Sequence, residues 1–352
     1  MKVIVVGASG ETGTSVVHGL IKSAENIEVT AVARKSSLDK PEYLALKDLG
    51  VTISTVDLST VSDELVSVLT GADVVISCLT SGNAEHVENQ NNLASACKRA
   101  SVGRFVPSFF GPICPPRGIM LLRNLKEDLL DHIKSLYLPY TVIDVGWWYQ
   151  LSLPPLPSGR LTNALTMHVQ TISGDGNTET ALIDKRDIGK YVARIIVDSR
   201  TLNKSVFVFN EIWTQNRIFD LMEKLSGEEI PRSHVGFPNY LISYLSTTQL
   251  SITPDRNDVL IIFKANEQAL QSKIKSANEA VAAGDNTQIR NLVMSQYELV
   301  LGIRGDNSPE CAKYLGYLIG KDLYPDLQGE SLEQFINDTL AGKIERLYAR
   351  RR

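Results

Sequence analysis

The first thirteen residues contain a glycine-rich segment whose residue types and spacing suit the binding of phosphate groups. The segment follows the apolar run Val3–Val6 and consists of Gly7, Ala8, Ser9, Gly10, Glu11, Thr12 and Gly13. Three glycines at this spacing allow a tight exit from a strand, close approach of the backbone to a pyrophosphate, and close packing of the next helix. The N-terminus of that helix adds free N–H groups and a positive dipole end. The segment therefore predicts a dinucleotide site, with an ordinary tight turn as the alternative.

Two cations follow the second expected strand and bear on which dinucleotide fits. Proteins that bind NAD usually place an acidic residue about 20 residues after the glycines, on the ribose 2′-hydroxyl. Here that place holds Arg34 and Lys35, and the next acidic residue is Asp39. A guanidinium can stack on adenine and bind a phosphate through two hydrogen bonds. We therefore expect NADPH/NADP⁺ rather than NADH, unless the two charges simply face solvent.

A lysine stands among apolar side chains on a helix expected over 121–137. The apolar residues of this helix face are Leu122, Leu125, Leu129, Leu130, Ile133 and Leu136. With about 100° of rotation per residue, Lys126 falls inside that stripe. The other charged residues fall outside it: Arg123, Glu127, Asp128 and Asp131. Because burying an unpartnered ammonium is costly, the lysine either extends to solvent or works as a general acid or base with a lowered pKa.

Other catalytic and metal-binding patterns find little support. The sequence has no Gly-x-Ser-x-Gly elbow for a serine nucleophile. The Tyr-x-x-x-Lys pair of many short-chain dehydrogenases occurs at Tyr43/Lys47 and Tyr317/Lys321. Neither pair lies after the fifth expected strand, so we interpret both as coincidences on helix surfaces. The four cysteines and five histidines show no metal-ligand spacing, so no metal site is expected.

The elements that must position these residues lie in the first 150 residues. Six short runs are expected to form strands: Val3–Val6, Val29–Ala33, Val51–Thr55, Val74–Ser77, Phe105–Pro107 and Tyr140–Val145. Helical patterns lie near 11–23, 40–49, 60–70, 84–100 and 121–137. Continuous Val/Ile runs indicate strands buried on both faces. Their alternation with helices indicates an α/β fold, a Rossmann-type doubly wound parallel sheet.

The pattern changes after about residue 150. The run Leu153-Pro154-Pro155-Leu156-Pro157 predicts an irregular turn, and a polar–apolar helical pattern extends from Asn266 to Leu301. We therefore divide the chain into an NADP-binding Rossmann domain over 1–150 and a smaller C-terminal substrate lobe over 151–352. Within that lobe, 179–209 is expected to return to the main sheet. The lobe is expected to pack on the carboxyl ends of the strands, where ligands bind in such folds.

Composition bears on partners and location. The 352 residues carry 36 basic and 40 acidic side chains, a net charge of −4, so no nucleic-acid surface is expected. No apolar run approaches the roughly 20 residues of a membrane span, and the cysteines suggest no disulfide framework. We expect a cytoplasmic protein with a small-molecule substrate, and the sequence leaves a homodimer open.

Several further motifs along the chain occur together in one known family. They are Val-Val-Ile-Ser at 74–77, Arg-Phe-Val-Pro-Ser-Phe-Phe-Gly at 104–111, Leu-Pro-Tyr-Thr at 138–141, Gly-Asp-Gly-Asn at 174–177, Asp-Ser-Arg-Thr-Leu-Asn-Lys at 198–204 and Leu-Tyr-Pro-Asp at 323–326. With these motifs, the glycine segment and Arg34, the sequence resembles the NmrA-like, isoflavone-reductase-like branch of the atypical short-chain dehydrogenases. The resemblance covers most of the chain, and Arg-Thr-Leu-Asn-Lys is its motif most specific to the reductases.

This resemblance implies a catalytic role for Lys126. In the family a catalytic lysine precedes the proline of the Pro-Tyr-Thr strand by thirteen positions, and here that position is Lys126. The resemblance implies that Lys126 contacts the nicotinamide ribose and acts as general acid or base while hydride leaves C4 of the ring. The remaining residues that we assign to the cofactor site are Thr80, Ser81, Pro107 and Ser108.

Departures from the family pattern concern the substrate. Phe109 replaces a carboxylate beside the nicotinamide, and the two arginines that follow the family's lysine are lost. The region from about 235 to 300 is expanded, and the segment after the Pro-Tyr-Thr strand is unusually aromatic. We predict an aromatic wall for a flat, apolar or cationic substrate, made of Phe109, Phe110, Trp147, Trp148 and Tyr149. The alternative is that these side chains belong to the core.

Three functions are compatible with these features. The first is an NADPH-dependent reductase of a small aromatic or alkaloid-like secondary metabolite, with the proton supplied by Lys126 or a water that it holds. The second is an enzyme that keeps the dinucleotide but catalyses cyclisation or isomerisation, which the replacement at Phe109 keeps open. The third is an NmrA-like redox-sensing regulator without turnover, and Lys126 and the Arg-Thr-Leu-Asn-Lys run argue against it.

Overall fold

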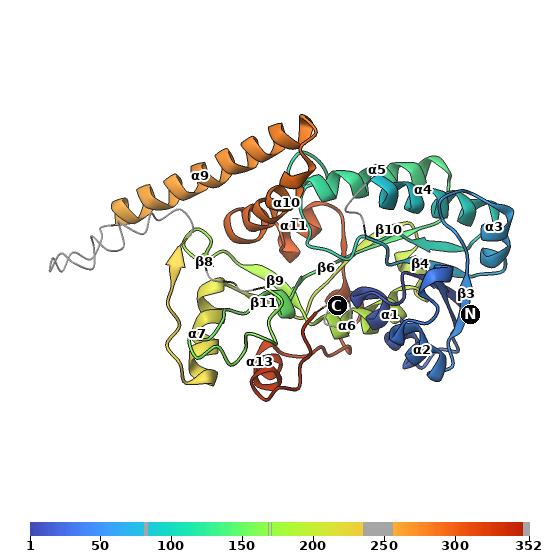
Figure 1. The fold of residues 1–352 in the computed structure, drawn as a ribbon, viewed down its shortest axis with the longest axis horizontal. Helices are drawn as coiled ribbons and strands as arrows, with labels where there is room; N and C mark the ends of the chain where they lie inside the picture. Colours follow the sequence, from blue (N-terminus) through green and yellow to red (C-terminus); the bar gives the residue numbers. More distant parts are fainter. Residues whose placement is uncertain (81–83, 168, 170, 235–255, 348–352) are drawn as a thin grey trace.

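A parallel β-sheet runs through the N-terminal half of the molecule (Figure 1). The computed structural model describes residues 1–80, 84–167, 169, 171–234 and 256–347. Five strands lie in the spatial order β3-β2-β1-β4-β5, and every neighbouring pair is parallel. Their bounds are β1 (Lys2–Val6), β2 (Glu28–Ala33), β3 (Thr52–Thr55), β4 (Val74–Ser77) and β5 (Arg104–Val106).

Three more parallel strands continue this sheet beyond β5. A bridge between Phe105 and Tyr140 joins β5 to β6 (Thr141–Val145). β10 (Lys204–Val208) pairs with β6, and β13 (Leu318–Ile319) pairs with β10. The predicted doubly wound parallel sheet is confirmed, and it is wider than the six strands expected from the first 150 residues.

Helices cover both faces of the sheet, which is why its central strands β1 and β4 are largely apolar. Val3 and Val5 of β1 pack into one core cluster and Ile4 and Val6 into another, each at most 2% exposed. One face carries α1 (Glu11–Ile21), α2 (Pro41–Asp48) and α6 (Lys185–Ile195), and the other carries α3 (Asp63–Leu69), α4 (Ala84–Arg99) and α5 (Leu121–Ser135) (Figure 1). Burial on both faces is the feature that the continuous Val/Ile runs predicted.

The helices α1 and α6 touch through small residues. A Cβ atom on Gly19 would overlap the backbone of Gly189, and one on Gly189 would overlap the carbonyl of Ser15. The Ser15 hydroxyl donates to the Lys185 carbonyl at 2.6 Å and accepts from the Gly189 N–H at 3.1 Å. This close approach brings the N-terminus of α6 beside that of α1, so residues 174 positions apart meet at the glycine turn.

A smaller sheet and an apolar cluster form the second lobe (Figure 1). Its elements are β7 (Trp147–Trp148), β9 (Thr180–Ile183), β11 (Glu211–Trp213), α7 (Gln215–Ser226) and α13 (Leu332–Leu340). The strand order is β11-β9-β7, with β9 in the centre. The expectation that 179–209 returns to the main sheet therefore holds for β10 and is wrong for β9, which pairs antiparallel with β11.

The remaining elements are short or belong to the C-terminal third. They are β8 (Thr171–Ile172), β12 (Ser233–His234), α9 (Arg256–Ala282), α10 (Ile289–Glu298), α11 (Pro309–Tyr314), α12 (Gly320–Leu323), a π-helical turn at Leu299–Arg304, and 3₁₀ turns at Lys35–Ser37, Tyr149–Leu151, Ser199–Thr201 and Asn286–Gln288. The helical pattern from Asn266 to Leu301 spans two helices, because Gly284, at φ +95°, ends α9. Among the described residues, no helix has the length and apolar character required to cross a membrane.

Candidate active site

The glycine segment forms the turn between β1 and α1. Gly7 has φ +82°, and Gly10 donates its N–H to the Gly7 carbonyl at 3.1 Å. A Cβ atom on Gly13 would overlap the backbone of Gly7 and lie 2.7 Å from the Cα of Ala8. No side chain of the described residues caps α1 at Gly10, which leaves the first N–H groups of the helix available to a ligand. The turn therefore fits a pyrophosphate, which needs an open helix end and close backbone approach.

Glu11, which we expect at the cofactor site, has a side-chain partner within the protein. As the first residue of α1, it forms an ion pair with Lys185, the first residue of α6. A carboxylate beside phosphate groups repels them, and the ammonium of Lys185 offsets that charge. Sequence reasoning missed Lys185 because 174 residues separate it from Glu11.

Arg34 follows β2, whose parallel pairing with β1 brings the carboxyl ends of both strands to the same edge. The side chains of Arg34 and Lys35 are exposed there. A phosphate on the adenosine ribose of a bound dinucleotide, lying across the glycine turn, would be attracted by both cations. The placement is the one that the sequence predicts for NADPH.

Tyr43 of α2 belongs to this site rather than to a helix surface, so the interpretation of Tyr43/Lys47 as a surface coincidence is wrong for the tyrosine. Its side chain is 3% exposed. Its hydroxyl hydrogen-bonds the Ser9 side chain and lies 3.4 Å from the Val32 carbonyl oxygen. Burial raises the pKa of this hydroxyl, which stays a neutral donor. Tyr43 thus links the glycine turn to the end of β2.

The ends of β4 and β5 lie at the same edge of the sheet. The Ser108 hydroxyl donates to the Leu79 carbonyl at 2.6 Å and so holds the two strand ends together. The Thr80 hydroxyl is 2.8 Å from Nδ1 of His86. Pro107 is buried between β5 and Ser108. These three assigned cofactor residues therefore gather beside the glycine turn, whereas Ser81 lies outside the described residues.

Lys126 projects from α5 toward the segment that follows β5. Its Nζ donates to the carbonyl oxygen of Phe109, lies 5.8 Å from the centre of the Phe109 ring, and would be 3.2 Å from a Cβ atom on Gly111. Burial, and to a smaller extent repulsion by Arg123, lower the pKa of this ammonium to about 8, while attraction by Asp144 opposes the shift. Lys126 therefore has the lowered pKa expected of a lysine that exchanges protons near neutral pH.

The charged residues beside Lys126 contradict the expectation that α5 has one polar, exposed face. Arg123 is 5% exposed and donates to Glu127 at 2.8 Å and to Asp144 of β6 at 2.7 Å. The Tyr317 hydroxyl donates to the same Asp144 oxygen at 2.7 Å and accepts from Arg123. The surface interpretation of Tyr317 is therefore wrong as well. The physical reason is that α5 packs against α4 on one side and against β6 and the Tyr317 segment on the other.

The five aromatic residues do not form one wall. Phe109 and Tyr149 are at most 1% exposed, and Phe110 packs into the main core cluster. The prediction of substrate contacts is therefore wrong for these three as exposed surfaces, and the core alternative holds. Trp147 and Trp148 are partly exposed, and the Trp147 ring lies 5.0 Å from that of Tyr297 on α10. Substrate contacts by these two tryptophans stay a prediction.

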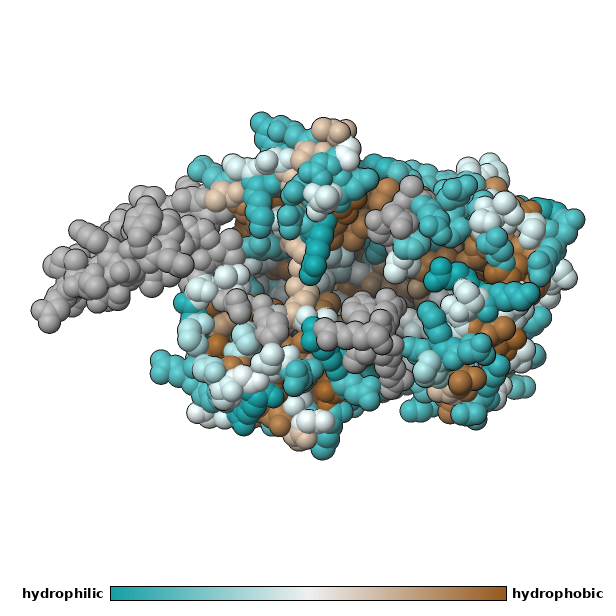
Figure 2. Space-filling model, viewed as in Figure 1, coloured by the Kyte–Doolittle hydropathy of each residue, from teal (hydrophilic) through white to brown (hydrophobic). Residues whose placement is uncertain are grey.

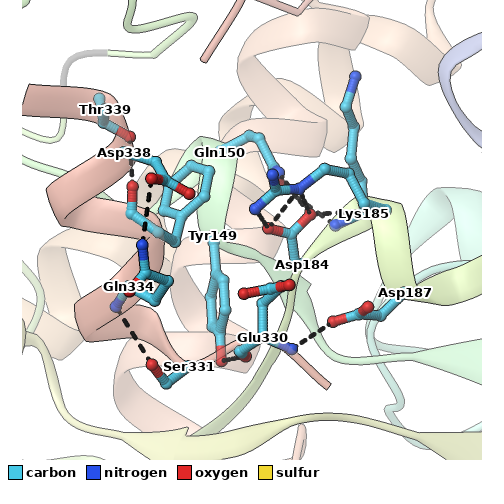
Figure 3. A network of polar contacts seen from close by, with 12 residues as sticks. Tyr149, Gln150, Asp184, Lys185, Asp187, Glu330, Ser331, Gln334, Asp338 and Thr339 are labelled. Atoms are coloured by element: carbon cyan, nitrogen blue, oxygen red, sulfur yellow. Dashed lines mark hydrogen bonds and ion pairs between the residues drawn. The ribbon is translucent and has the colours of Figure 1, made fainter. Parts of the chain in front are cut away.

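A buried polar network holds the Tyr149 hydroxyl in the protein interior (Figure 3). Its hydroxyl hydrogen-bonds a carboxylate oxygen of Glu211 at 2.9 Å and the Glu330 carbonyl at 3.2 Å. Asp184 caps α6 and accepts from Gln150 at 3.0 Å. The network thus ties the small sheet, α6 and the segment before α13 together, and it fixes the helix end that carries Lys185. A tyrosine in a core and a tyrosine in a pocket look alike in sequence.

Two hollows lie on the surface, and one of them adjoins the glycine turn. Figure 2 shows a depression between the part that carries α5 and the part that carries α1, with hydrophilic side chains along its rim. A groove of about 430 Å³ also runs along α1, from the glycine turn to the C-terminal segment 343–346. No group of three or more His, Cys, Asp or Glu side chains suited to a metal ion occurs in the part of the chain that is described.

Comparison with known proteins agrees with this geometry. Residues 1–254 match the model of the NmrA-like family. The chain is 39% identical to the asnovolin J 5′,6′-dehydrogenase of Aspergillus novofumigatus, over 97% of this chain and 96% of that protein. It is 30% identical to pinoresinol reductase 1 of Arabidopsis thaliana, over 68% of this chain and 79% of that protein.

Solved structures support the fold. The binary complex of leucoanthocyanidin reductase from Vitis vinifera with NADPH superposes with a TM-score of 0.72 at 20% identity, over 97% of this chain and 100% of that chain. Isoflavone reductase superposes with a TM-score of 0.67 at 20% identity, over 96% and 98%. The family match over residues 1–254 and the relative at 39% identity agree with the fold. The chain therefore belongs to the NmrA-like family, in its branch of isoflavone-reductase-like oxidoreductases.

Proposed function

We propose that this chain is an NADP(H)-dependent oxidoreductase that transfers hydride between the nicotinamide and a ring carbon of a small, largely apolar secondary metabolite. The observation that carries the proposal is the position of Lys126. Its partly buried ammonium donates to the Phe109 carbonyl, in the segment that follows β5. A dinucleotide laid across the glycine turn extends along the carboxyl edge of the sheet toward this lysine. The nicotinamide, which donates the hydride, and Lys126, which donates the proton, would then lie side by side.

The residues of the turn bind and orient the dinucleotide. Gly7, Gly10 and Gly13 allow its pyrophosphate to approach the backbone, and Arg34 and Lys35 bind the 2′-phosphate. When bound, the nicotinamide supplies or accepts the hydride. Lys126 contacts its ribose and handles the proton: with a pKa of about 8, it is mostly ammonium at pH 7 and donates during reduction. Near pH 8 and above it is increasingly an amine and accepts a proton during oxidation.

The substrate class rests on the aromatic residues that stay exposed and on the relatives. Trp147 and Trp148 offer flat, apolar surfaces for ring stacking, which suits an aromatic or alkaloid-like molecule. The relative at 39% identity is a dehydrogenase of asnovolin J, and we propose that this chain likewise acts at a bond of its substrate that gains or loses two hydrogens.

Binding measurements test the cofactor half of the proposal. NADPH fluorescence titration of the purified full chain is expected to give tighter binding than NADH, and Arg34→Ala is expected to remove most of that preference. Lys40→Ala, which removes an exposed cation a few residues further along, is the matched control and is expected to leave the preference intact. Equal affinities for NADPH and NADH in the unmodified chain would overturn the assignment.

Isotope transfer tests the chemistry. With NADPH deuterated at C4 and pinoresinol among the substrates offered for reduction, deuterium is expected to appear at a carbon of the product. Asnovolin J, which a dehydrogenase oxidises, is offered with NADP⁺ instead, and formation of NADPH is the readout. Lys126→Ala is expected to lower kcat at least a hundredfold, because general acid catalysis contributes about 10²–10⁴-fold. An isomerised or cyclised product without deuterium would instead establish the non-redox alternative.

A further inference from the structure

Three residues, one each from α5, β6 and the segment before β13, form a closed polar triangle beside Lys126. Arg123 of α5 donates to Asp144 of β6, Tyr317 donates to the same Asp144 oxygen, and Arg123 donates to the Tyr317 hydroxyl. Asp144 is fully buried and Arg123 is 5% exposed. The other oxygen of Asp144 is buried and accepts no hydrogen bond from the described residues. Burying such a charge is costly unless a nearby cation compensates it.

Phe109 connects this triangle to the lysine. The Arg123 guanidinium lies 5.0 Å from the centre of the Phe109 ring, and the Lys126 Nζ lies 5.8 Å from the same centre. The Phe109 carbonyl accepts the hydrogen bond of Lys126. The arginine and the lysine, three residues apart on α5, therefore share one aromatic ring. The Phe110 N–H donates to the Ile143 carbonyl and the Val145 N–H donates to the Gly111 carbonyl, each at 2.9 Å, so the neighbours of Asp144 on β6 hold the segment that Lys126 contacts.

The charged and titratable groups that act most strongly on Lys126 come from α5, from β6 and from the segment between β5 and α5. Arg123 and Glu127 belong to α5, Asp144 belongs to β6, and Cys114 belongs to the segment between β5 and α5. Burial raises the pKa of Cys114 to about 12, so this thiol is neutral near pH 7. Glu127 is paired with Arg123. The charges of Arg123 and Asp144 act on Lys126 in opposite directions, and they are therefore the ones to remove by substitution.

We propose that Asp144, held in place by Arg123 and Tyr317, is a positioning residue for Lys126: its carboxylate keeps the lysine protonated and directed at the Phe109 carbonyl near neutral pH. This inference rests on the proposed function only for the use made of the proton. The electrostatic effect on Lys126 exists whether or not hydride moves. Asp144 attracts the ammonium while Arg123 repels it. Neutralising Asp144 is therefore expected to lower the pKa of Lys126, and neutralising Arg123 is expected to raise it.

The direct test measures the titration of Lys126 without any substrate. Competitive acetylation of the full chain with acetic anhydride, across pH 6 to 11, yields the midpoint at which this amine becomes reactive, read by mass spectrometry of the peptide that contains it. Asp144→Asn is expected to lower the midpoint, and Arg123→Met is expected to raise it, each by about one unit, the lower end of the shift that a neighbouring charge produces. Tyr317→Phe keeps both charges and is expected to shift it less than either.

Opposite shifts distinguish an electrostatic role from a structural one. A general loosening of the helix would expose Lys126 in both variants and move both midpoints upward. An unchanged or raised midpoint in Asp144→Asn, or a lowered midpoint in Arg123→Met, would overturn the proposal. Should Asp144→Asn fail to fold, the double variant Arg123→Met/Asp144→Asn, which leaves neither charge buried alone, decides: its midpoint is expected to lie below that of Arg123→Met, and an equal or higher midpoint would overturn the proposal.

The activity profile separates this inference from the proposed function. If Lys126 is the general acid, the alkaline limb of the pH profile of kcat for substrate reduction is expected to move in parallel with the labelling midpoint in each variant. Labelling midpoints that shift as expected while the limb stays fixed would leave the positioning role intact and remove Lys126 from catalysis.

Discussion

Replacing Lys126 by methionine is expected to stabilise the protein near neutral pH while removing activity. Methionine keeps an unbranched stem of similar length and lacks the charge, so the substitution isolates the cost of the buried ammonium. That cost follows from the pKa of Lys126, which is about 8 in the folded chain against an ordinary value of 10.5. Each unit of difference corresponds to about 1.4 kcal/mol.

The sign follows from which state holds the proton. Between pH 8 and 10.5 the unfolded chain keeps a proton on this lysine and the folded chain has lost it, so stability of the unmodified protein rises with pH across this window. The ammonium costs about 3 kcal/mol at pH 7 and about 1.5 kcal/mol at pH 9.5. Methionine also loses the hydrogen bond to Phe109 and the contact with its ring, about 1–2 kcal/mol together. A net gain of about 1–2 kcal/mol at pH 7 is expected.

Urea unfolding followed by circular dichroism, at pH 7 and at pH 9.5, measures both quantities. The advantage of Lys126→Met over the unmodified chain is expected to shrink by about 1.5–2 kcal/mol between the two pH values, whatever the lost contacts cost. Lys134→Met on the same helix, where the lysine is exposed, is the matched control and is expected to show no such dependence. A variant that is less stable at pH 7, with a difference that does not change with pH, would refute the reasoning.

Two further substitutions test the glycine turn and the hydrogen bonds of Tyr149 in the second lobe. Gly13→Ala places a Cβ atom into the backbone of Gly7; it is expected to weaken NADPH binding at least tenfold in fluorescence titration, and an unchanged affinity would contradict the pyrophosphate role of the turn. Tyr149→Phe removes the hydroxyl that bonds Glu211 and the Glu330 carbonyl; it is expected to cost about 1–3 kcal/mol in urea unfolding, and no loss would mean that the hydroxyl is satisfied equally well by water in the unfolded chain.

The first five strands and the cofactor turn were predictable because their signals are local. Residues of β1 alternate between two buried faces, so a run of Val and Ile is required there and is visible without knowing the partners. The turn is likewise specified locally, by Gly13, whose contacts are with Gly7 and Ala8, and by Gly7, whose φ of +82° favours glycine. Tyr43 was missed because its partner Ser9 lies on another element, and the spacing of the two carries no signal.

Aromatic residues after β6 were misassigned for a related reason. Large aromatic side chains serve equally in cores and in pockets, and only their neighbours distinguish the two uses. Tyr149 is held in the core by Glu211 and Glu330, which lie 62 and 181 residues away. Trp147 and Trp148, on the same short strand, stay partly exposed. The sequence around 147–149 contains no signal that distinguishes the buried tyrosine from the two partly exposed tryptophans.

The polar triangle around Lys126 follows from the extension of the sheet beyond β5. A helix that covers the edge of a six-stranded sheet has one face in solvent, and α5 was expected to behave in this way. Because β10 and β13 continue the sheet, the Tyr317 segment before β13 and Val142 of β6 pack against Leu130 on the other side of α5. Arg123 and Glu127 are then buried and must be paired. The added strands thereby help to enclose the lysine, whose burial lowers its pKa, and Asp144 of β6 supplies the charge that keeps it a proton donor.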